Sequence, residues 1–182
     1  MTDTSSSWED TLDPAGLSCG PDRYQECSRD PQRTPFQWND QDNAGFSEAD
    51  QTWLPVNENY LWLNAATQRA SPDHNSHYWV YVDTMWVRRN FLRDNTKFLT
   101  VGNTFVALNE NWVLLLNFSD SEQTINLTDK ILENGFSLGL GVVSARSVDG
   151  KDENMFGSQH FLSEDFIVGS FEAILLTELP SN

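Results

Sequence analysis

The stretch SRDPQRTPFQW, residues 28–38, concentrates side chains that could bind a polar ligand. Its two prolines disfavour a regular helix, so the four-residue spacing of its arginines, Arg29 and Arg33, does not place them on one helix face. A guanidinium is a rigid fork of donors that can hold adjacent hydroxyls and a neighbouring carboxylate together. We interpret this stretch as a shaped loop that makes specific contacts.

Catalytic motifs are absent elsewhere in the sequence. There is no Gly-x-Ser-x-Gly turn, no glycine-rich phosphate loop and no His-Glu-x-x-His pair. The count of 27 Asp and Glu residues leaves room for a carboxylate pair of the kind that cleaves glycosides. Most carboxylates on so acidic a chain are nevertheless solvated, so the residue types alone assign no catalytic residue.

Charge and composition exclude several classes of partner. The formal net charge is −16, which disfavours nucleic acid and anionic lipid surfaces. No apolar run reaches the ~18–20 residues that span a bilayer. His74, His77 and His160 have no metal-ligand spacing with the cysteines, so we predict neither a metal site nor a cofactor.

Two further features concern covalent chemistry. Cys19 and Cys27 lie close together in a loop, where a disulfide and two free thiols are both open. The sequons Asn117-Phe-Ser119 and Asn126-Leu-Thr128 are candidate glycosylation sites. Asn126 is the better candidate, because Asn117 ends a strongly apolar predicted strand.

The sequence pattern changes along the chain, and the secondary structure that we predict changes with it. Residues 1–70 are irregular and rich in Asp, Asn, Pro and Ser. Residues 72–91 predict one amphipathic helix with an aromatic stripe. From residue 97, short β-rich runs predict a small antiparallel sandwich or barrel, with a hairpin around residues 109–111 and WVLLLNF as a central buried strand.

The order of the motifs resembles one enzyme family. SRDPQRTPFQW is followed by NAGFS, residues 43–47, and TWLPVNENY, residues 52–60, and is preceded by SWEDTLDPAG, residues 7–16. Together they resemble insect-type maltases, the α-glucosidases of glycoside hydrolase family 13. The resemblance covers essentially the whole chain and weakens after about residue 130.

The resemblance implies a mainly β fold with a loop-rich remnant. Residues 1–94 would be the end of a (β/α)8 barrel with its last helix, and residues 95–182 the C-terminal antiparallel sandwich. Arg33 would contact the glucose at the non-reducing end of an α-glucoside. The motifs that carry the catalytic carboxylates precede SRDP in the family and do not occur here, so we expect an inactive chain corresponding to the last third of a maltase.

The same resemblance bears on location and partners. Family members are secreted, whereas MTDTSSSWEDTLDP, the first residues here, is polar and acidic and does not predict a signal peptide. With the barrel absent, the helix stripe would expose an apolar face through which the chain could associate.

Two alternatives to the maltase interpretation stay open. One is a non-catalytic soluble interaction module related to the heavy chains of amino-acid transporters. The other is direct sugar binding by the sandwich, which the core-like position of Trp112 disfavours.

Overall fold

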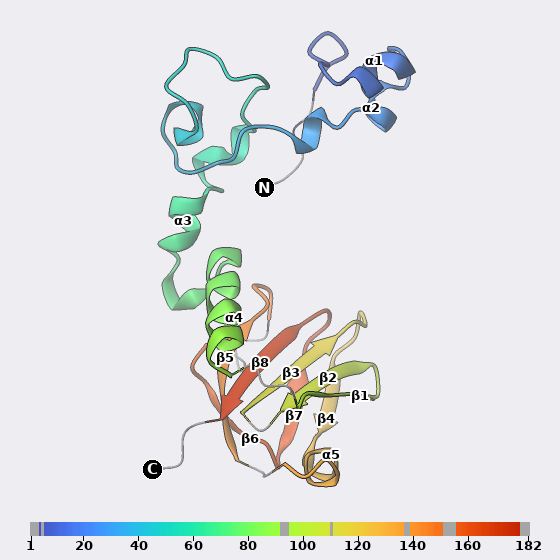
Figure 1. Cartoon of the computed structure of the whole chain (residues 1–182), viewed down its shortest axis with the longest axis vertical. Helices are drawn as coiled ribbons and strands as arrows, with labels where there is room; N and C mark the ends of the chain where they lie inside the picture. Colours follow the sequence, from blue (N-terminus) through green and yellow to red (C-terminus); the bar gives the residue numbers. More distant parts are fainter. Residues whose placement is uncertain are drawn as a thin grey trace. The chain divides into compact units, whose positions relative to one another are not determined.

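The structure is a computed structural model that describes residues 4, 6–91, 95–109, 111–136, 139–150 and 156–178. The chain forms two compact units, residues 1–70 and residues 71–182 (Figure 1). The predicted division into a barrel remnant, residues 1–94, and a sandwich, residues 95–182, stays a prediction. In the structure the helix of residues 77–91 belongs to the second unit, together with the sheets.

Unit 1 contains short helices joined by irregular segments. Helix α1, Pro14–Cys19, begins where Asp13 caps the free N–H of Ala15 and proline occupies the first turn. Helix α3, Ala65–Arg69, is capped by Asn64, whose side chain accepts the N–H of Thr67. The other elements are α2, Tyr24–Cys27, and the single 3₁₀ turns η1, Asp30–Gln32, η2, Asp42–Gly45, and η3, Glu58–Leu61.

Unit 2 is built on an antiparallel sheet of six strands in the order β1-β2-β3-β8-β5-β6. These strands are β1, Lys97–Val101, β2, Thr104–Asn109, β3, Trp112–Asn117, β5, Leu140–Arg146, β6, Gln159–Phe161, and β8, Ala173–Glu178. A second sheet pairs β4, Gln123–Asn126, with β7, Asp165–Val168. The predicted mainly β architecture with an antiparallel C-terminal sandwich is confirmed.

The predicted hairpin and central strand are both present. Asn109 pairs with Trp112 across the β2–β3 turn. Strand β3 lies between β2 and β8, and Val113 and Leu115 are almost completely buried. Leu115 contributes to a core shared by both sheets, formed by Val106, Leu108, Val113, Leu115, Ile125, Leu127, Ile131, Val143, Leu162, Phe166, Val168, Ile174 and Leu176.

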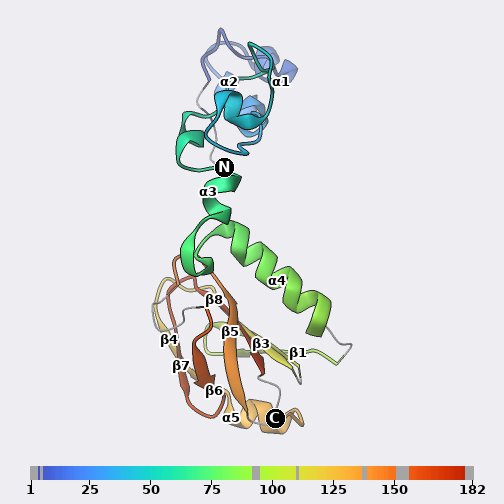
Figure 2. The same ribbon diagram turned by 90° about the vertical axis from the view of Figure 1, so that its left-hand side faces the viewer.

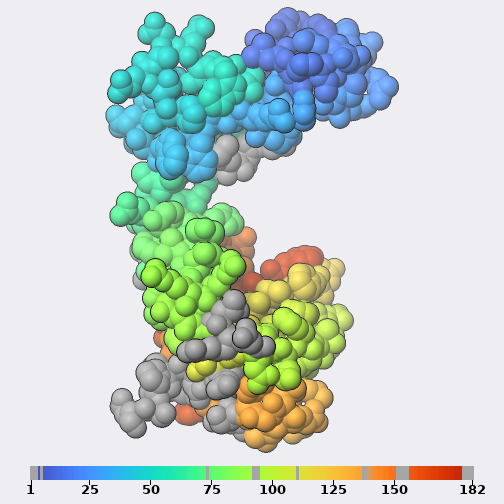
Figure 3. All heavy atoms as spheres, viewed as in Figure 1, coloured from blue at the N-terminus to red at the C-terminus, as the bar shows by residue number. Residues whose placement is uncertain are grey.

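Helix α4, His77–Phe91, covers the other face of the six-stranded sheet (Figure 2). The turn η4, Pro72–His74, precedes it, so the predicted helix over residues 72–91 is interrupted at its start. Val87 and Phe91 pack against Trp112, whose indole N–H donates to the Phe91 carbonyl at 3.2 Å. Most of the aromatic stripe stays open, with Tyr81 67% and Trp86 55% exposed, and green α4 atoms form part of the surface in Figure 3.

Sequence patterns missed three elements of unit 2. They are the short strands β6 and β7 and helix α5, Thr128–Glu133. Helix α5 buries Ile131 beside the fully buried Leu127. Within the described part of the chain, no helix combines the length and apolarity needed to cross a membrane.

Candidate functional site

Arg33 projects from a loop whose backbone is held on both sides. Its N–H donates to the Asp30 carbonyl at 3.0 Å and closes turn η1. Its carbonyl accepts the indole N–H of Trp53 at 3.0 Å. The following residues, Thr34 and Pro35, are buried, whereas Arg33 itself is exposed. The loop is therefore fixed at its backbone and presents the guanidinium to its surroundings.

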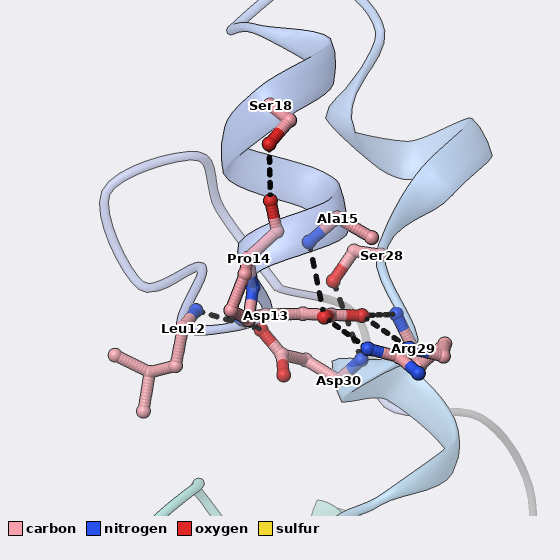
Figure 4. A network of polar contacts seen from close by, with 8 residues as sticks. All are labelled: Leu12, Asp13, Pro14, Ala15, Ser18, Ser28, Arg29 and Asp30. Atoms are coloured by element: carbon pink, nitrogen blue, oxygen red, sulfur yellow. Dashed lines mark hydrogen bonds and ion pairs between the residues drawn. The ribbon is translucent and has the colours of Figure 1, made fainter.

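Two aspartates that precede Arg33 in the chain clamp this loop to residues 12–15 (Figure 4). Asp30 accepts the N–H groups of Leu12 and Asp13 at 2.7 and 2.9 Å through one carboxylate oxygen. Asp13 in return accepts the backbone N–H of Arg29 at 2.7 Å and both arms of its guanidinium at 2.7 and 2.8 Å. Asp13 and Asp30 are each 5% exposed. Because little water competes for their hydrogen bonds, these bonds hold the two segments together.

The ion pair between Asp13 and Arg29 shifts the pKa of both residues. Hydrogen bonds from the Arg29 side chain and then from its backbone N–H hold the pKa of Asp13 well below its ordinary value. The same contacts raise the pKa of Arg29. Asp13 is thus ionised across the physiological range, and the clamp is maintained there.

A disulfide closes the loop between the two clamped segments. It joins Cys19, the last residue of α1, to Cys27, the last residue of α2. At Gly16 a Cβ atom would lie 2.9 Å from carbon atoms of both Thr11 and Ser28. A glycine is needed there because the two segments approach so closely.

Gln37 and Trp38, which follow Arg33, have different surroundings. Gln37 is 1% exposed, and its amide nitrogen donates to the Asn59 side chain. Trp38 is 54% exposed and contacts the Phe36 ring at a centroid distance of 4.6 Å. Within unit 1, Gln37 is therefore a packing residue, whereas Trp38 is largely exposed.

The two candidate glycosylation sites differ in accessibility. Asn117 is 2% exposed, and its amide nitrogen donates to the carbonyls of Ser121 and Gly169 at 2.8 and 2.7 Å. Asn126 is exposed on β4, where its amide nitrogen donates to Asp165 at 2.8 Å. Asn117 supports the packing of unit 2, whereas Asn126 can be reached from solvent.

Sequence reasoning missed a histidine–aspartate pair in unit 2. The Nδ1 atom of His74 lies 2.8 Å from a carboxylate oxygen of Asp83, and the His74 ring stacks between Trp79 and Phe156. Burial raises the pKa of Asp83, and the contact with His74 partly opposes this effect. His74 and Asp83 are nine positions apart in the sequence, one in a turn and the other in a helix, so no local spacing signals the pair.

Sequence reasoning also missed a groove in unit 1. It has a volume of about 860 Å³, and except for Tyr60 its lining residues fall within residues 39–50. The backbone there makes a left-handed turn at Asn43, Ala44 and Gly45, with φ of 50°, 55° and 66°. The carbonyl of Ala44 accepts the N–H groups of Trp38 and Asn39 at 2.9 and 3.2 Å, so the groove is tied to the end of the arginine loop.

No part of the described chain assembles a metal centre. Among these residues, no three His, Cys, Asp or Glu side chains are grouped so that they could hold an ion. Arg33, Arg29 and the amides around them instead provide hydrogen bonds for uncharged or anionic oxygen atoms.

Comparison with solved structures defines the class of protein. Trehalulose synthase MutB from Pseudomonas mesoacidophila MX-45 aligns with a TM-score of 0.63 over 97% of this chain and 33% of its own, at 18% identity. An isomaltulose synthase variant from Erwinia rhapontici NX5 aligns with a TM-score of 0.61 over 99% of this chain and 34% of its own. The chain thus shares the fold of about one third of each of these proteins.

Sequence comparison then identifies the family. A family model for the catalytic domain of α-amylase matches residues 1–96. An α-glucosidase of Apis mellifera is 40% identical over 136 residues, which are 70% of this chain and 24% of the relative. Maltase A1 of Drosophila melanogaster is 31% identical over 175 residues, or 92% of this chain and 30% of the relative. The chain belongs to the α-amylase family of glycoside hydrolases, on its α-glucosidase branch.

The match to these relatives is partial. The chain spans 24% of the honeybee protein, 30% of the Drosophila maltase and 24% of a salivary α-glucosidase from Anopheles gambiae, to which it is 37% identical over 141 residues. The aligned part includes the clamped loop with Arg33, because the family match runs from residue 1 to residue 96.

Proposed function

We propose that this chain serves in the hydrolysis of terminal α-glucosidic bonds and supplies the sugar-contacting Arg33. The observation that carries the proposal is the α-amylase family match over residues 1–96, where a clamped loop presents an exposed arginine. Several donors on one rigid guanidinium suit the adjacent hydroxyls of a glucose ring. The catalytic carboxylates are contributed by the remainder of the catalytic domain.

A chimaera tests this proposal directly. Residues 1–182 would replace the matching part of the honeybee α-glucosidase, and maltose hydrolysis would be measured. We expect the chimaera to be active and the isolated chain to be inactive. Arg33→Ala should lower kcat/KM by about 10- to 100-fold, since a hydrogen bond to a charged group contributes roughly 1.5–3 kcal/mol.

Matched variants separate sugar contact from general effects of charge. Arg23→Ala removes another exposed arginine of unit 1, which pairs with Glu26 at the surface, and should leave kcat/KM unchanged. Arg33→Lys keeps the charge but loses the fork and should recover little activity. An active chimaera in which Arg33→Ala has no effect would refute the role of Arg33.

Secretion and glycosylation belong to the same proposal. Salivary α-glucosidases of Anopheles gambiae and Aedes aegypti are among the relatives, which supports an extracellular parent protein. We expect a glycan on Asn126 and none on the buried Asn117 when the protein passes through an insect secretory pathway. Peptide mass spectrometry of wild type and Asn126→Gln checks this, and a glycan on Asn117 would contradict it.

A second candidate function is that of a non-catalytic partner. The amino acid transporter heavy chain SLC3A1 of Rattus norvegicus is 25% identical over 128 residues, and the open face of α4 offers Tyr81 and Trp86 for association. An inactive chimaera together with stable capture of a second protein through this face would favour this alternative over catalysis.

A further inference from the structure

We propose that the groove of unit 1 is a carbohydrate-binding site in which Phe46 provides the sugar-stacking surface, and that Trp53 joins Phe46 to the loop that carries Arg33. The inference deepens the proposed function and rests on it for the choice of an α-linked glucoside as ligand. Nothing in the family match assigns a ligand to this groove.

The first support is the arrangement of the two rings. Phe46 lines the groove and contacts the Trp53 ring edge-to-face, with centroids 5.1 Å apart and an interplanar angle of 78°. Phe46 is 38% and Trp53 54% exposed. Solvent-open rings held in a fixed mutual geometry offer apolar area to the C–H face of a pyranose at low entropic cost.

The second support is the connection to Arg33. The Trp53 indole N–H donates to the Arg33 carbonyl at 3.0 Å, so one side chain joins the ring pair to the arginine backbone. The indole N–H is thereby satisfied, while more than half of the side chain stays accessible. A sugar stacked on Phe46 would thus lie on a ring that Trp53 connects to the Arg33 loop.

The third support is the polar lining of the groove. Its volume of about 860 Å³ falls in the range of small-molecule sites. Amides, carboxylates and hydroxyls contribute to its surface, namely Asn39, Gln41, Asp42, Asn43, Ser47, Glu48, Asp50 and Tyr60. Such groups can both accept from and donate to sugar hydroxyls.

The charge of the lining selects a class of ligand. Asp42, Glu48 and Asp50 are exposed carboxylates, and they disfavour phosphorylated or otherwise anionic ligands. A neutral sugar is not repelled, and its hydroxyls can donate to the carboxylates. The groove therefore fits an uncharged oligosaccharide better than a nucleotide or a sugar phosphate.

Nuclear magnetic resonance of the ¹⁵N-labelled chain tests the proposal. Maltose would be titrated while the indole N–H signals are followed, with sorbitol as a polyol that lacks a ring face and glucose 1-phosphate as a charged analogue. We expect a saturable shift of the Trp53 signal in the millimolar range of maltose and no such shift for Trp62, which is 66% exposed. Sorbitol and the phosphate should leave both signals in place.

Variants make the assignment specific. Phe46→Leu removes one ring and keeps the Trp53 reporter, and it should weaken maltose binding by at least about fivefold. Glu48→Ala removes a polar group from the lining of the groove and should also weaken maltose binding. Trp62→Ala should leave maltose binding unchanged. Trp53→Ala should also weaken maltose binding. If that variant does not fold, Phe46→Leu still tests the site, because it keeps the hydrogen bond from the Trp53 indole to the Arg33 carbonyl.

The outcomes separate this inference from the proposed function. Equal responses to maltose and sorbitol, or tighter binding of the phosphate, would overturn the sugar site. An active chimaera whose KM is insensitive to Phe46→Leu would overturn it while leaving the α-glucosidase function standing. Binding at Trp53 together with an inactive chimaera would support the groove and refute the catalytic proposal.

Discussion

The carboxylate of Asp13 shows how a single residue can order a functional loop. It caps α1 through Ala15 and binds Arg29 through both its backbone and its side chain. Asp30 makes the reciprocal contacts with Leu12 and Asp13. Each segment thus supplies the acceptor that the other lacks, and Arg33 lies three residues beyond Asp30.

Asp13→Asn should lower the melting temperature of unit 1 at neutral pH, and the difference should vanish in acid. The folded state lowers the pKa of Asp13 from its ordinary value of 3.8. The carboxylate therefore contributes stability above that value, and this stability is lost as the pH falls below it. Thermal unfolding followed by circular dichroism at neutral and acidic pH checks the expectation.

A surface ion pair provides the control for this experiment. Arg23 and Glu26 form an exposed pair at 2.9 Å, and exposed pairs contribute little. Arg23→Ala should melt close to wild type at both pH values. A difference for Asp13→Asn that persists unchanged in acid would show that the charge of Asp13 is not responsible.

Asn117→Ala should destabilise unit 2 by about 2–4 kcal/mol. The substitution leaves the buried carbonyl of Gly169 and the N–H of Ser119, which now bond to the Asn117 side chain, without that partner. Asn126→Gln, at an exposed position, should change stability by less than about 0.5 kcal/mol. Urea unfolding measures both, and similar values for the two variants would contradict the assigned roles.

Single residues also show which features of the site could not be predicted from the sequence. The arginine loop was recognisable because its prolines and arginines form a continuous motif. The groove was not, since its shape depends on the left-handed backbone of Asn43 and Ala44, which non-glycine residues rarely adopt. The contact between His74 and Asp83 depends on the turn before α4, which the sequence did not predict.

At the scale of elements, helix α4 has two faces with different roles. Val87 is 4% exposed and packs with Trp112 and Leu175 on the sheet. Tyr81, Met85 and Trp86 are open. The sequence predicted a broad apolar stripe that would be exposed without the barrel, but it did not single out Val87 as the contact with the sheet, because that contact depends on tertiary packing.

Substitutions on the two faces should therefore differ. Val87→Ala should cost about 1.5–3 kcal/mol, from two buried carbon atoms at ~0.8 kcal/mol each and the cavity they leave. Tyr81→Gln, at a position that is 67% exposed, should cost less than about 0.5 kcal/mol despite the larger change in hydrophobicity. Chemical denaturation of both variants tests this, and a larger loss for Tyr81→Gln would show that the open face is covered.

The strands were predicted where their signals are local. The β2–β3 hairpin has a short turn between β-rich runs, and the sequence located it correctly. Strand β6 has only three residues and β7 only four, too few to establish an alternating pattern. Helix α5 has six residues and gains its stability from burying Ile131 in the shared core, which is a tertiary effect.

At the scale of the whole molecule, the described residues of 71–182 form a core of their own. Both sheets share one apolar cluster, and α4 closes a second on the outer face. Residues 71–182 produced alone should therefore unfold in one cooperative transition, at the midpoint found for unit 2 in the full chain. Calorimetry checks this, and a fragment without a transition would show that residues 1–70 are needed for folding.

The strand order has a consequence for how the protein is made. Strand β8 follows all the other described strands in the sequence, yet it lies between β3 and β5 in the centre of the six-stranded sheet. Until the ribosome has released residues 173–178, β3 and β5 each expose an unpaired edge that can recruit other chains. Nascent chains should thus depend on chaperones until β8 has emerged, and a chain that stops at residue 172 should aggregate rather than fold.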